Sequence, residues 1–193
     1  LVSVVMPTYN AAHFLHIAVR SIIAQTYENL EIIVVDDGSK DNTAEVVDRF
    51  AKYDKRIKYA PKENGGIASA LNYGFNMASG RYLARADADD FSLPYRIEET
   101  IKPFMQFPDI GLVFTTFIYF TGRPGDFTFD RDIDNNPQTY IDRDKRDFFH
   151  ALINANFVPN GSVLLHRDVW NQIGTFDGDL PRPCWEDYDY WLR

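Results

Sequence analysis

The first half of the chain alternates short apolar runs with stretches in which apolar side chains recur every three or four residues. Apolar runs typical of buried strands occupy residues 2–7, 30–35, 56–61 and 81–86. Helical periodicity occupies residues 11–25, 44–53, 65–80 and 92–101. Strands that alternate with helices in this way predict an α/β fold whose parallel sheet is covered by helices on both faces.

The second half follows a different pattern. Residues 110–120 form an apolar run with partly polar alternation, which indicates a strand in a mixed sheet. Residues 121–147 are polar with Pro and Gly, so we expect a long loop there. The remaining stretches predict a helix at 147–157, a strand running into a short helix at 161–170, and a last helix after residue 185.

Single residues predict three helix ends. Asn42, with Glu45 three residues later, matches the capping pattern at the start of a helix. Gly80 is expected at the C-terminal end of the third helix, and Pro94 in the first turn of the fourth.

Length and composition fit one globular domain, 1–193, since 45% of the 193 residues are hydrophobic. The net charge of -8 argues against nucleic acid as a partner, because phosphate binding needs clustered basic residues. The single cysteine, Cys184, excludes an intrachain disulfide and favours a reducing compartment. No run is long enough for a membrane span, and no signal-peptide pattern is present. The start on a strand without Met and the end within a predicted helix lead us to expect a chain truncated at its C-terminus.

Polar residues follow three of the predicted strands, at the sheet edge where α/β proteins bind ligands. These are Pro7 to Asn10, Asp36 with Asp37, and Asp87 to Asp90. Asp87 and Asp89 have the spacing and the oxygen ligands that suit a hard cation such as Mg²⁺ or Mn²⁺. The alternative is a solvated acidic turn in which Asp90 or Ser92 caps the next helix. A dinucleotide-binding glycine pattern and a P-loop are both absent.

Four further features have both a functional and a purely structural interpretation. Asp37 either accepts a hydrogen bond from a nucleobase or only shapes a turn, and Tyr9 either stacks on a base or lies in a turn. Gly65 and Gly66 either hold an anion at a helix N-terminus or form a flexible turn. Asp187 is either a general base or an acidic residue that complements the dipole of the last helix.

Taken in order along nearly the whole chain, these segments resemble the family-2 glycosyltransferases, which are inverting enzymes. The resemblance rests on "VSVVMPTYN", "VVDDGS", "NGGIASALNYG", "YLARADADD" and "WEDYDYWLR". It implies the GT-A fold, a Rossmann-like, mixed and mostly parallel sheet with helices on both faces. Residues 1–120 would form the nucleotide-sugar-binding half of the domain and residues 121–193 the acceptor-side half.

The resemblance also implies a role for each matching residue. Asp187 would be the catalytic base and Asp89 the direct metal ligand, with Mn²⁺ or Mg²⁺ as the metal. Asp37 would accept a hydrogen bond from the base, most often uracil, and Asp87 would lie near the ribose. The other residues expected to contact nucleotide or substrate are Pro7, Thr8, Tyr9, Asn64, Gly65, Gly66, Asp90 and Glu186.

The implied activity is metal-dependent transfer of a hexosyl or N-acetylhexosaminyl group from a nucleotide-diphosphate sugar, with UDP favoured, to an acceptor hydroxyl. A saccharide or lipid-linked saccharide is the expected acceptor, in polysaccharide biosynthesis. The expected location is the cytoplasm. The domain would lie at the inner face of the membrane if a lipid-linked acceptor or a segment outside this chain attached it there. The alternatives are a non-catalytic nucleotide- or glycan-binding domain and, less favoured, a nucleotidyltransferase.

One departure from the family pattern bears on phosphate binding. The helix after the glycine turn has no basic residue, so Arg81, Arg85 or a later residue is expected to take that role. His150, Asn160 and Trp185 are candidates for the acceptor side.

Overall fold

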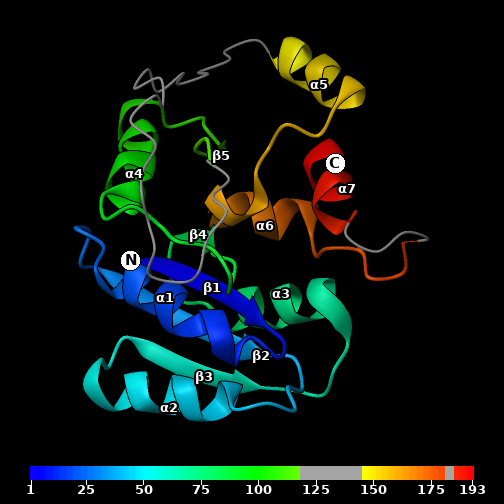
Figure 1. Cartoon of the computed structure of the whole chain (residues 1–193). Coiled ribbons are helices and arrows are strands. Elements are labelled where there is room, and N and C mark those ends of the chain that lie inside the picture. Colours follow the sequence, from blue (N-terminus) through cyan, green and yellow to red (C-terminus); the bar gives the residue numbers. More distant parts are fainter. Residues whose placement is uncertain (118–144, 181–184) are drawn as a thin grey trace, which may run out of the picture.

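Six strands form a single sheet in the order β3-β2-β1-β4-β6-β5, in which the first four strands are parallel and β6 and β5 are antiparallel to their neighbours. The computed structural model describes residues 1–117, 145–180 and 185–193. Figure 1 shows the sheet from β3 near the bottom to β5 higher up. The strands are β1 Val2–Thr8, β2 Leu30–Asp36, β3 Ile57–Pro61, β4 Tyr82–Arg85, β5 Leu112–Val113 and β6 Leu164–His166.

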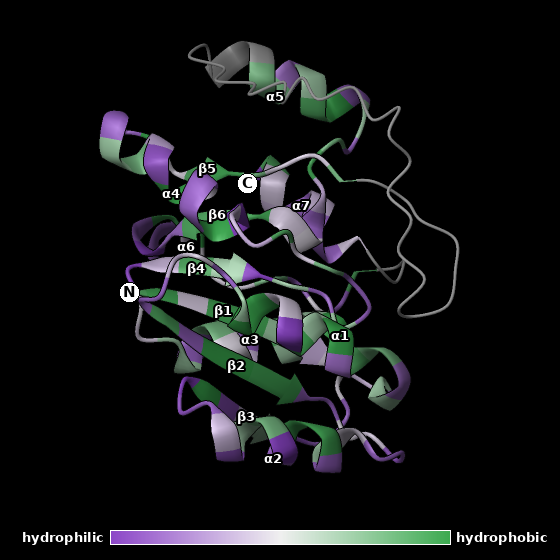
Figure 2. Ribbon diagram, turned by 60° about the vertical axis from the view of Figure 1, so that its left-hand side comes forward, coloured by the Kyte–Doolittle hydropathy of each residue, from purple (hydrophilic) through white to green (hydrophobic). Residues whose placement is uncertain are grey.

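Helices cover both faces of the sheet because successive strand residues point to opposite sides. Val4 and Met6 of β1 belong to one apolar cluster with α1, α2 and α4, whereas Val5 belongs to a second cluster with α3, α6 and α7. β2 is apolar along most of its length, as buried parallel strands are (Figure 2). The helices are α1 Ala12–Ile23, α2 Thr43–Tyr53, α3 Gly66–Met77, α4 Arg96–Gln106, α5 Lys145–Asn154, α6 Arg167–Ile173 and α7 Glu186–Leu192, with a 3₁₀ turn at Asn160–Ser162.

The predicted class, a mixed and mostly parallel sheet between helices, is confirmed. The strand expected at 110–120 is shorter, since β5 comprises only Leu112–Val113, and residues 118–120 lie outside the described part of the chain. Most of the loop expected at 121–147 lies outside it too, as does Cys184. None of the described helices has both the length and the apolar character needed to cross a bilayer.

Of the three predictions for helix ends, the N-cap position of Asn42 is confirmed, whereas those for Gly80 and Pro94 are wrong in detail. The Asn42 side chain makes no capping bond; the carboxylate of Asp41 accepts the Thr43 N–H instead, at 3.0 Å. Helix α3 ends before Ala78, and Gly80 lies beyond it, where a side chain would collide with the backbone of Ser3 at 2.8 Å. Pro94 precedes α4, whose N-cap is Tyr95.

A buried carboxylate ties together the edge of the sheet where the parallel strands begin. Glu31 accepts hydrogen bonds from the hydroxyls of Ser3 and Ser79, from the N–H groups of Ser79 and Gly80, and from the ammonium of Lys58. Burial acts to raise the pKa of Glu31, but the bonds from Lys58, Ser3 and Ser79 outweigh it and lower the pKa to about 2. The ionised carboxylate therefore stabilises the folded state.

We predict that Glu31→Gln lowers the free energy of unfolding by about 3 kcal/mol at pH 7, because a pKa lowered from 4.5 to about 2 corresponds to roughly that energy. This contribution is complete above about pH 4.5 in the wild type and disappears as the pH falls toward 2. Urea unfolding between pH 3 and 7 should therefore show a difference between the two proteins that narrows at low pH.

Glu45→Gln is the matched control, since Glu45 is exposed and pairs only with Arg49, at 3.8 Å. Equal losses in the two variants, or a difference that does not depend on pH, would contradict the role assigned to Glu31.

Candidate active site

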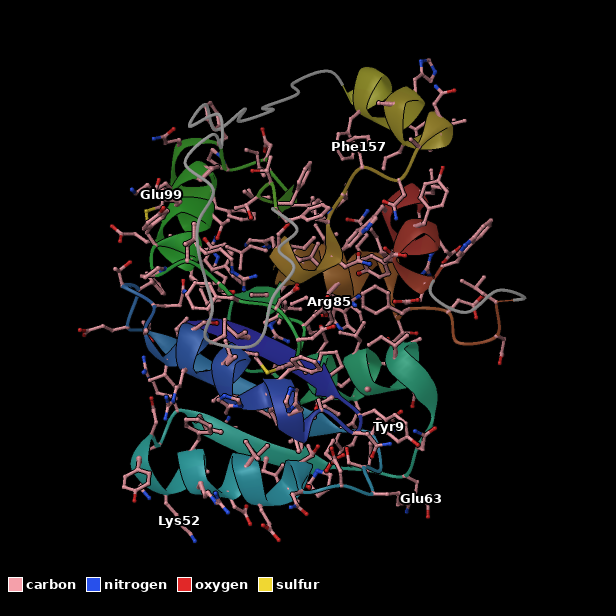
Figure 3. All side chains as sticks on the ribbon, viewed as in Figure 1. Tyr9, Lys52, Glu63, Arg85, Glu99 and Phe157 are labelled. Atoms are coloured by element: carbon pink, nitrogen blue, oxygen red, sulfur yellow. The ribbon has the colours of Figure 1, made fainter. Side chains whose placement is uncertain are left out.

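The polar strand ends predicted from the sequence lie side by side at one edge of the sheet. β1 lies between β2 and β4, so the segment after Thr8 is flanked by the acidic residues that follow both neighbours. Thr8 is buried, and no described residue is a hydrogen-bond partner for its hydroxyl. Tyr9 is 53% exposed, and Figure 3 shows it at the end of the sheet where Glu63 also lies. Asn10 has a φ of 50°, which turns the chain sharply after Tyr9.

Asp37 fixes the glycine turn at the start of α3. Its carboxylate accepts the N–H groups of Gly65 and Gly66 at 3.0 and 2.8 Å and the ammonium of Lys62 at 2.6 Å. The side chain of Asn64 donates to the main-chain carbonyl of Asp37, at 2.8 Å. Gly66 has a φ of 84°, a conformation that favours glycine. The glycine turn and the Asp37 carboxylate therefore fix each other's position through the two N–H bonds.

The "DADD" segment forms a turn directly after β4. The guanidinium of Arg85 donates to Asp87 at 2.8 Å, while Asp89 and Asp90 lie exposed at the tip. Partial burial, and then the negative charges of Asp87 and Asp89, raise the pKa of Asp90 to about 6. The carboxylates therefore repel one another strongly even with Arg85 beside them.

Two features hold this turn in place from behind. Arg96, which is buried, donates to the carbonyls of Arg85 and Gly161. Burial lowers the pKa of Arg96 to about 10, although the negative charges of Asp87 and Asp90 act to raise it. Gly161 lies so close that an added Cβ would meet Asp90 Oδ2 at 2.5 Å and Asp87 Oδ2 at 3.1 Å.

The acidic start of α7 approaches the same guanidinium from the other side. Glu186 and Asp187 are 5% and 4% exposed, and Glu186 Oε1 lies 3.5 Å from Arg85 Nη1. Burial acts to lower the pKa of Arg85, but the charges of Asp87, Glu186 and Asp187 outweigh it and raise the pKa. Figure 3 shows Arg85 between the strand ends and α7. Arg85 therefore links the two acidic motifs through a single buried charge.

Asp187 is held asymmetrically. Its Oδ2 accepts hydrogen bonds from the side-chain amides of Asn156, at 3.1 Å, and Asn160. Its Oδ1 is buried and has no partner among the described residues, and the same holds for Glu186 Oε2. Unpaired buried oxygens at one place indicate that a ligand with hydroxyl or N–H donors completes the site.

The carboxylates of the turn are oxygen ligands of the type that a hard divalent cation prefers. Asp87 Oδ2 and Asp90 Oδ2 both border the space that a Cβ on Gly161 would fill, and the pKa of Asp90 is raised by partial burial and then by the charges of Asp87 and Asp89. Among the described residues, no three His, Cys, Asp or Glu side chains are grouped to enclose a metal ion. The donor set therefore fits an open site, in which one or two carboxylates share the cation with phosphate oxygens and water.

Some candidates from the sequence lie elsewhere. Arg81 precedes β4, at the opposite edge of the sheet, where it donates to His166 at 3.1 Å, so of the basic residues considered it is Arg85 that lies beside the acidic turn. His150 is exposed on α5, and Trp185 is 48% exposed at the N-cap of α7. Asn160 does belong to the site. Sequence reasoning missed Lys62, Arg96, Asn156 and Gly161, whose contacts reach across the chain and leave no local pattern.

Comparison of the fold with solved structures defines the class of protein. S. aureus TarS residues 1–349, solved in complex with UDP, has a TM-score of 0.70 at 19% identity over 98% of this chain and 53% of that one. The mannosyltransferase PcManGT of Pyrobaculum calidifontis, solved with GDP-Man and Mn²⁺, has a TM-score of 0.68 at 23% identity over 93% and 48%. The fold is therefore the GT-A fold of glycosyltransferases.

Sequence comparison then gives the family. The model of glycosyl transferase family 2 matches residues 3–174, and the chain belongs to that family. Uncharacterised glycosyltransferases of Rickettsia bellii and Haemophilus influenzae are 31% and 34% identical over 193 and 198 residues, which is 100% and 99% of this chain. The chain spans 27% and 59% of the length of these two relatives.

We predict that Gly161→Ala displaces the acidic turn. The added methyl group would overpack against Asp90 and Asp87, and overpacking costs typically about 1–3 kcal/mol. Urea unfolding should show this loss in the variant. Gly178→Ala is the control, because the only atom near its Cβ is 4.0 Å away. A Gly161→Ala protein as stable as the control would show that the turn moves freely.

Proposed function

We propose that this domain transfers a sugar from a nucleotide-diphosphate sugar, with UDP as the nucleotide, to an acceptor hydroxyl with inversion at the anomeric carbon. The observation that carries the proposal is the buried guanidinium of Arg85, 2.8 Å from Asp87 and 3.5 Å from Glu186. It brings carboxylates suited to a donor diphosphate next to a carboxylate suited to an acceptor hydroxyl. A domain that only bound nucleotide would not need the second group.

The donor pocket in this proposal lies where β1 and β2 end. Tyr9 offers an exposed aromatic face for stacking on a base, beside Pro7 and Thr8. Asp37 accepts from the base, and the ammonium of Lys62, bonded to Asp37 at 2.6 Å, adds a donor next to that acceptor. Uracil presents a donor N–H between two carbonyl acceptors, which matches such a pair. TarS has been solved with UDP and with UDP-GlcNAc, which supports this choice of nucleotide.

A divalent metal, Mn²⁺ or Mg²⁺, is part of the proposal, with Asp89 as its direct ligand and Asp87 and Asp90 beside it. The mannosyltransferase PcManGT and a glucosyl-3-phosphoglycerate synthase were both solved with Mn²⁺, which supports the choice. When bound, the cation would stabilise the negative charge of the departing diphosphate.

The residues of α7 would carry out proton transfer. The acceptor oxygen attacks the anomeric carbon as the bond to the diphosphate breaks, and Oδ1 of Asp187 takes the acceptor proton. Glu186 Oε2 would accept a hydrogen bond from a substrate hydroxyl. Because attack comes from the face opposite the diphosphate and no enzyme nucleophile takes part, the configuration inverts.

The acceptor is proposed only as a class, a saccharide or lipid-linked saccharide, with a hexosyl or N-acetylhexosaminyl group as the sugar moved. The proposed setting is polysaccharide synthesis in the cytoplasm, at the inner face of the membrane for a lipid-linked acceptor. A non-catalytic nucleotide- or glycan-binding domain remains the competing function, and turnover separates the two.

We predict that UDP binds in a metal-dependent manner. Calorimetry with UDP, with and without Mn²⁺, should show binding that Asp89→Ala abolishes and that Asp109→Ala, an exposed control, leaves unchanged. Stronger binding of GDP than of UDP would overturn the choice of nucleotide, and UDP binding unaffected by Mn²⁺ would overturn the metal site.

We predict that Asp187→Asn abolishes transfer, because an amide cannot take the acceptor proton, while the affinity for UDP stays within about threefold. General-base catalysis typically contributes about 10²–10⁴-fold, which sets the expected loss in kcat. The assay follows UDP release with a panel of UDP-sugars and saccharide acceptors. Asp189→Asn is the control, since Asp189 lies in the same helix and pairs with Arg193 at 3.0 Å. A normal rate in Asp187→Asn would remove Asp187 as the base.

A further inference from the structure

We infer that Asn156 and Asn160 are positioning residues for the acceptor-activating carboxylate. Through their amides they hold Asp187 so that Oδ2 is occupied and Oδ1 alone is free to take a proton. The inference rests on the proposed function and adds to it the two residues that set the orientation of the base.

The contacts are unusually one-sided for a buried carboxylate. Both amides donate to Oδ2 of Asp187, whose residue is 4% exposed, while Oδ1 is buried without a partner among the described residues. A buried carboxylate oxygen without a hydrogen bond is energetically unfavourable, because it has lost its bonds to water without replacement. Rotation of the carboxylate would share the donors between its oxygens, and two amides from different positions prevent that rotation.

The local structure of α7 does not supply this orientation by itself. Asp187 is in the first turn of the helix, where an acidic side chain can turn back to accept main-chain N–H groups. The N-cap residue, Trp185, makes no side-chain cap, and the donors to the Asp187 carboxylate among the described residues are Asn156 and Asn160, both outside α7. The orientation of Asp187 therefore comes from residues outside its own helix.

The two asparagines come from a segment that also contacts the acidic turn. Asn160 begins the 3₁₀ turn, and the next residue, Gly161, lies against the carboxylates of Asp87 and Asp90. Two residues further on, the carbonyl of Val163 accepts the N–H of Arg85, at 3.1 Å. One short segment thus fixes Asp187 and the acidic turn relative to each other. This matters for the proposed reaction because reacting groups must be placed to within a fraction of an ångström.

A purely structural role for the asparagines makes different predictions. If they only held α7 against the fold, their removal would lower stability and nucleotide affinity together with turnover. Removing the asparagines would then cause the same losses whether residue 187 is aspartate or asparagine. If they act through Asp187, the loss is confined to kcat and depends on that carboxylate.

The experiment measures kcat, the KM for the donor, UDP affinity and the melting temperature for Asn156→Ala, Asn160→Ala and the double variant, each with Asp187 and with Asp187→Asn. With Asp187 present we expect kcat to fall by about 10²-fold in Asn160→Ala, the scale of a misplaced catalytic group. The KM for the donor and the UDP affinity should stay within about threefold. With Asp187→Asn, the asparagine changes should lower the residual rate no further.

Asn154→Ala is the matched control, because Asn154 lies in the same region and its amide donates to the carbonyl of His150, at 2.8 Å, rather than to Asp187. It should leave kcat unchanged. A second variant, Asn160→Leu, keeps a similar side-chain shape and removes the donor without adding a charge, so it should lose kcat as Asn160→Ala does.

Three results would overturn the inference: normal kcat in the double variant, a further loss of rate in the Asp187→Asn background, or parallel losses of kcat and UDP affinity. The comparison of kcat with UDP affinity is made in the Asp187 background, so it tests the inference even where the residual rate of Asp187→Asn is too low to measure. Failure of the proposed function looks different, since Asp187→Asn would then retain turnover, or no variant, wild type included, would release UDP from any UDP-sugar.

Discussion

The arrangement of this site depends on one buried positive charge, the guanidinium of Arg85. Asp87, Glu186 and Asp187 are carboxylates from distant parts of the chain, and without a cation their mutual repulsion and their desolvation would keep them apart. Arg85 lies at the end of β4, so the sheet itself places the charge. Because a guanidinium donates along several directions in one plane, it can face Asp87 and Glu186 at the same time.

The segment from Asn156 to Val163 converts this attraction into a defined geometry. It contacts Arg85 through the Val163 carbonyl, the acidic turn through Gly161, and Asp187 through Asn156 and Asn160. Arg96 donates to the carbonyls of Arg85 and Gly161, which joins the segment to β4. The acidic turn and Asp187 are thereby placed relative to each other by one segment of the main chain and its short side chains.

The sequence predicted the sheet, its helices and the acidic motifs, because apolar periodicity and strand-end carboxylates are local patterns. It placed the N-cap at Asn42 correctly but not the bond made there, since the Asp41 carboxylate accepts the Thr43 N–H. It misplaced Gly80 and Pro94 by two or three residues relative to the ends of α3 and α4, because tertiary contacts decide where a helix ends. It missed Lys62, Arg96 and Asn156 for a different reason. Each acts through a partner 11 to 65 residues away, and such pairs are defined only once the strands have paired.

The contrast between Glu31 and Asp187 shows how the same kind of group serves stability at one edge of the sheet and chemistry near the other. Both oxygens of Glu31 are occupied, by donors from Ser3, Ser79, Gly80 and Lys58, and its pKa is lowered to about 2. Asp187 is buried to a similar degree but keeps one oxygen unpaired. An unpaired buried oxygen destabilises a folded protein, and in the proposed function a substrate hydroxyl that donates to Oδ1 of Asp187 would recover that energy on binding. In that function the two carboxylates are complementary, since the fully bonded Glu31 stabilises the fold while Oδ1 of Asp187 is left for the substrate.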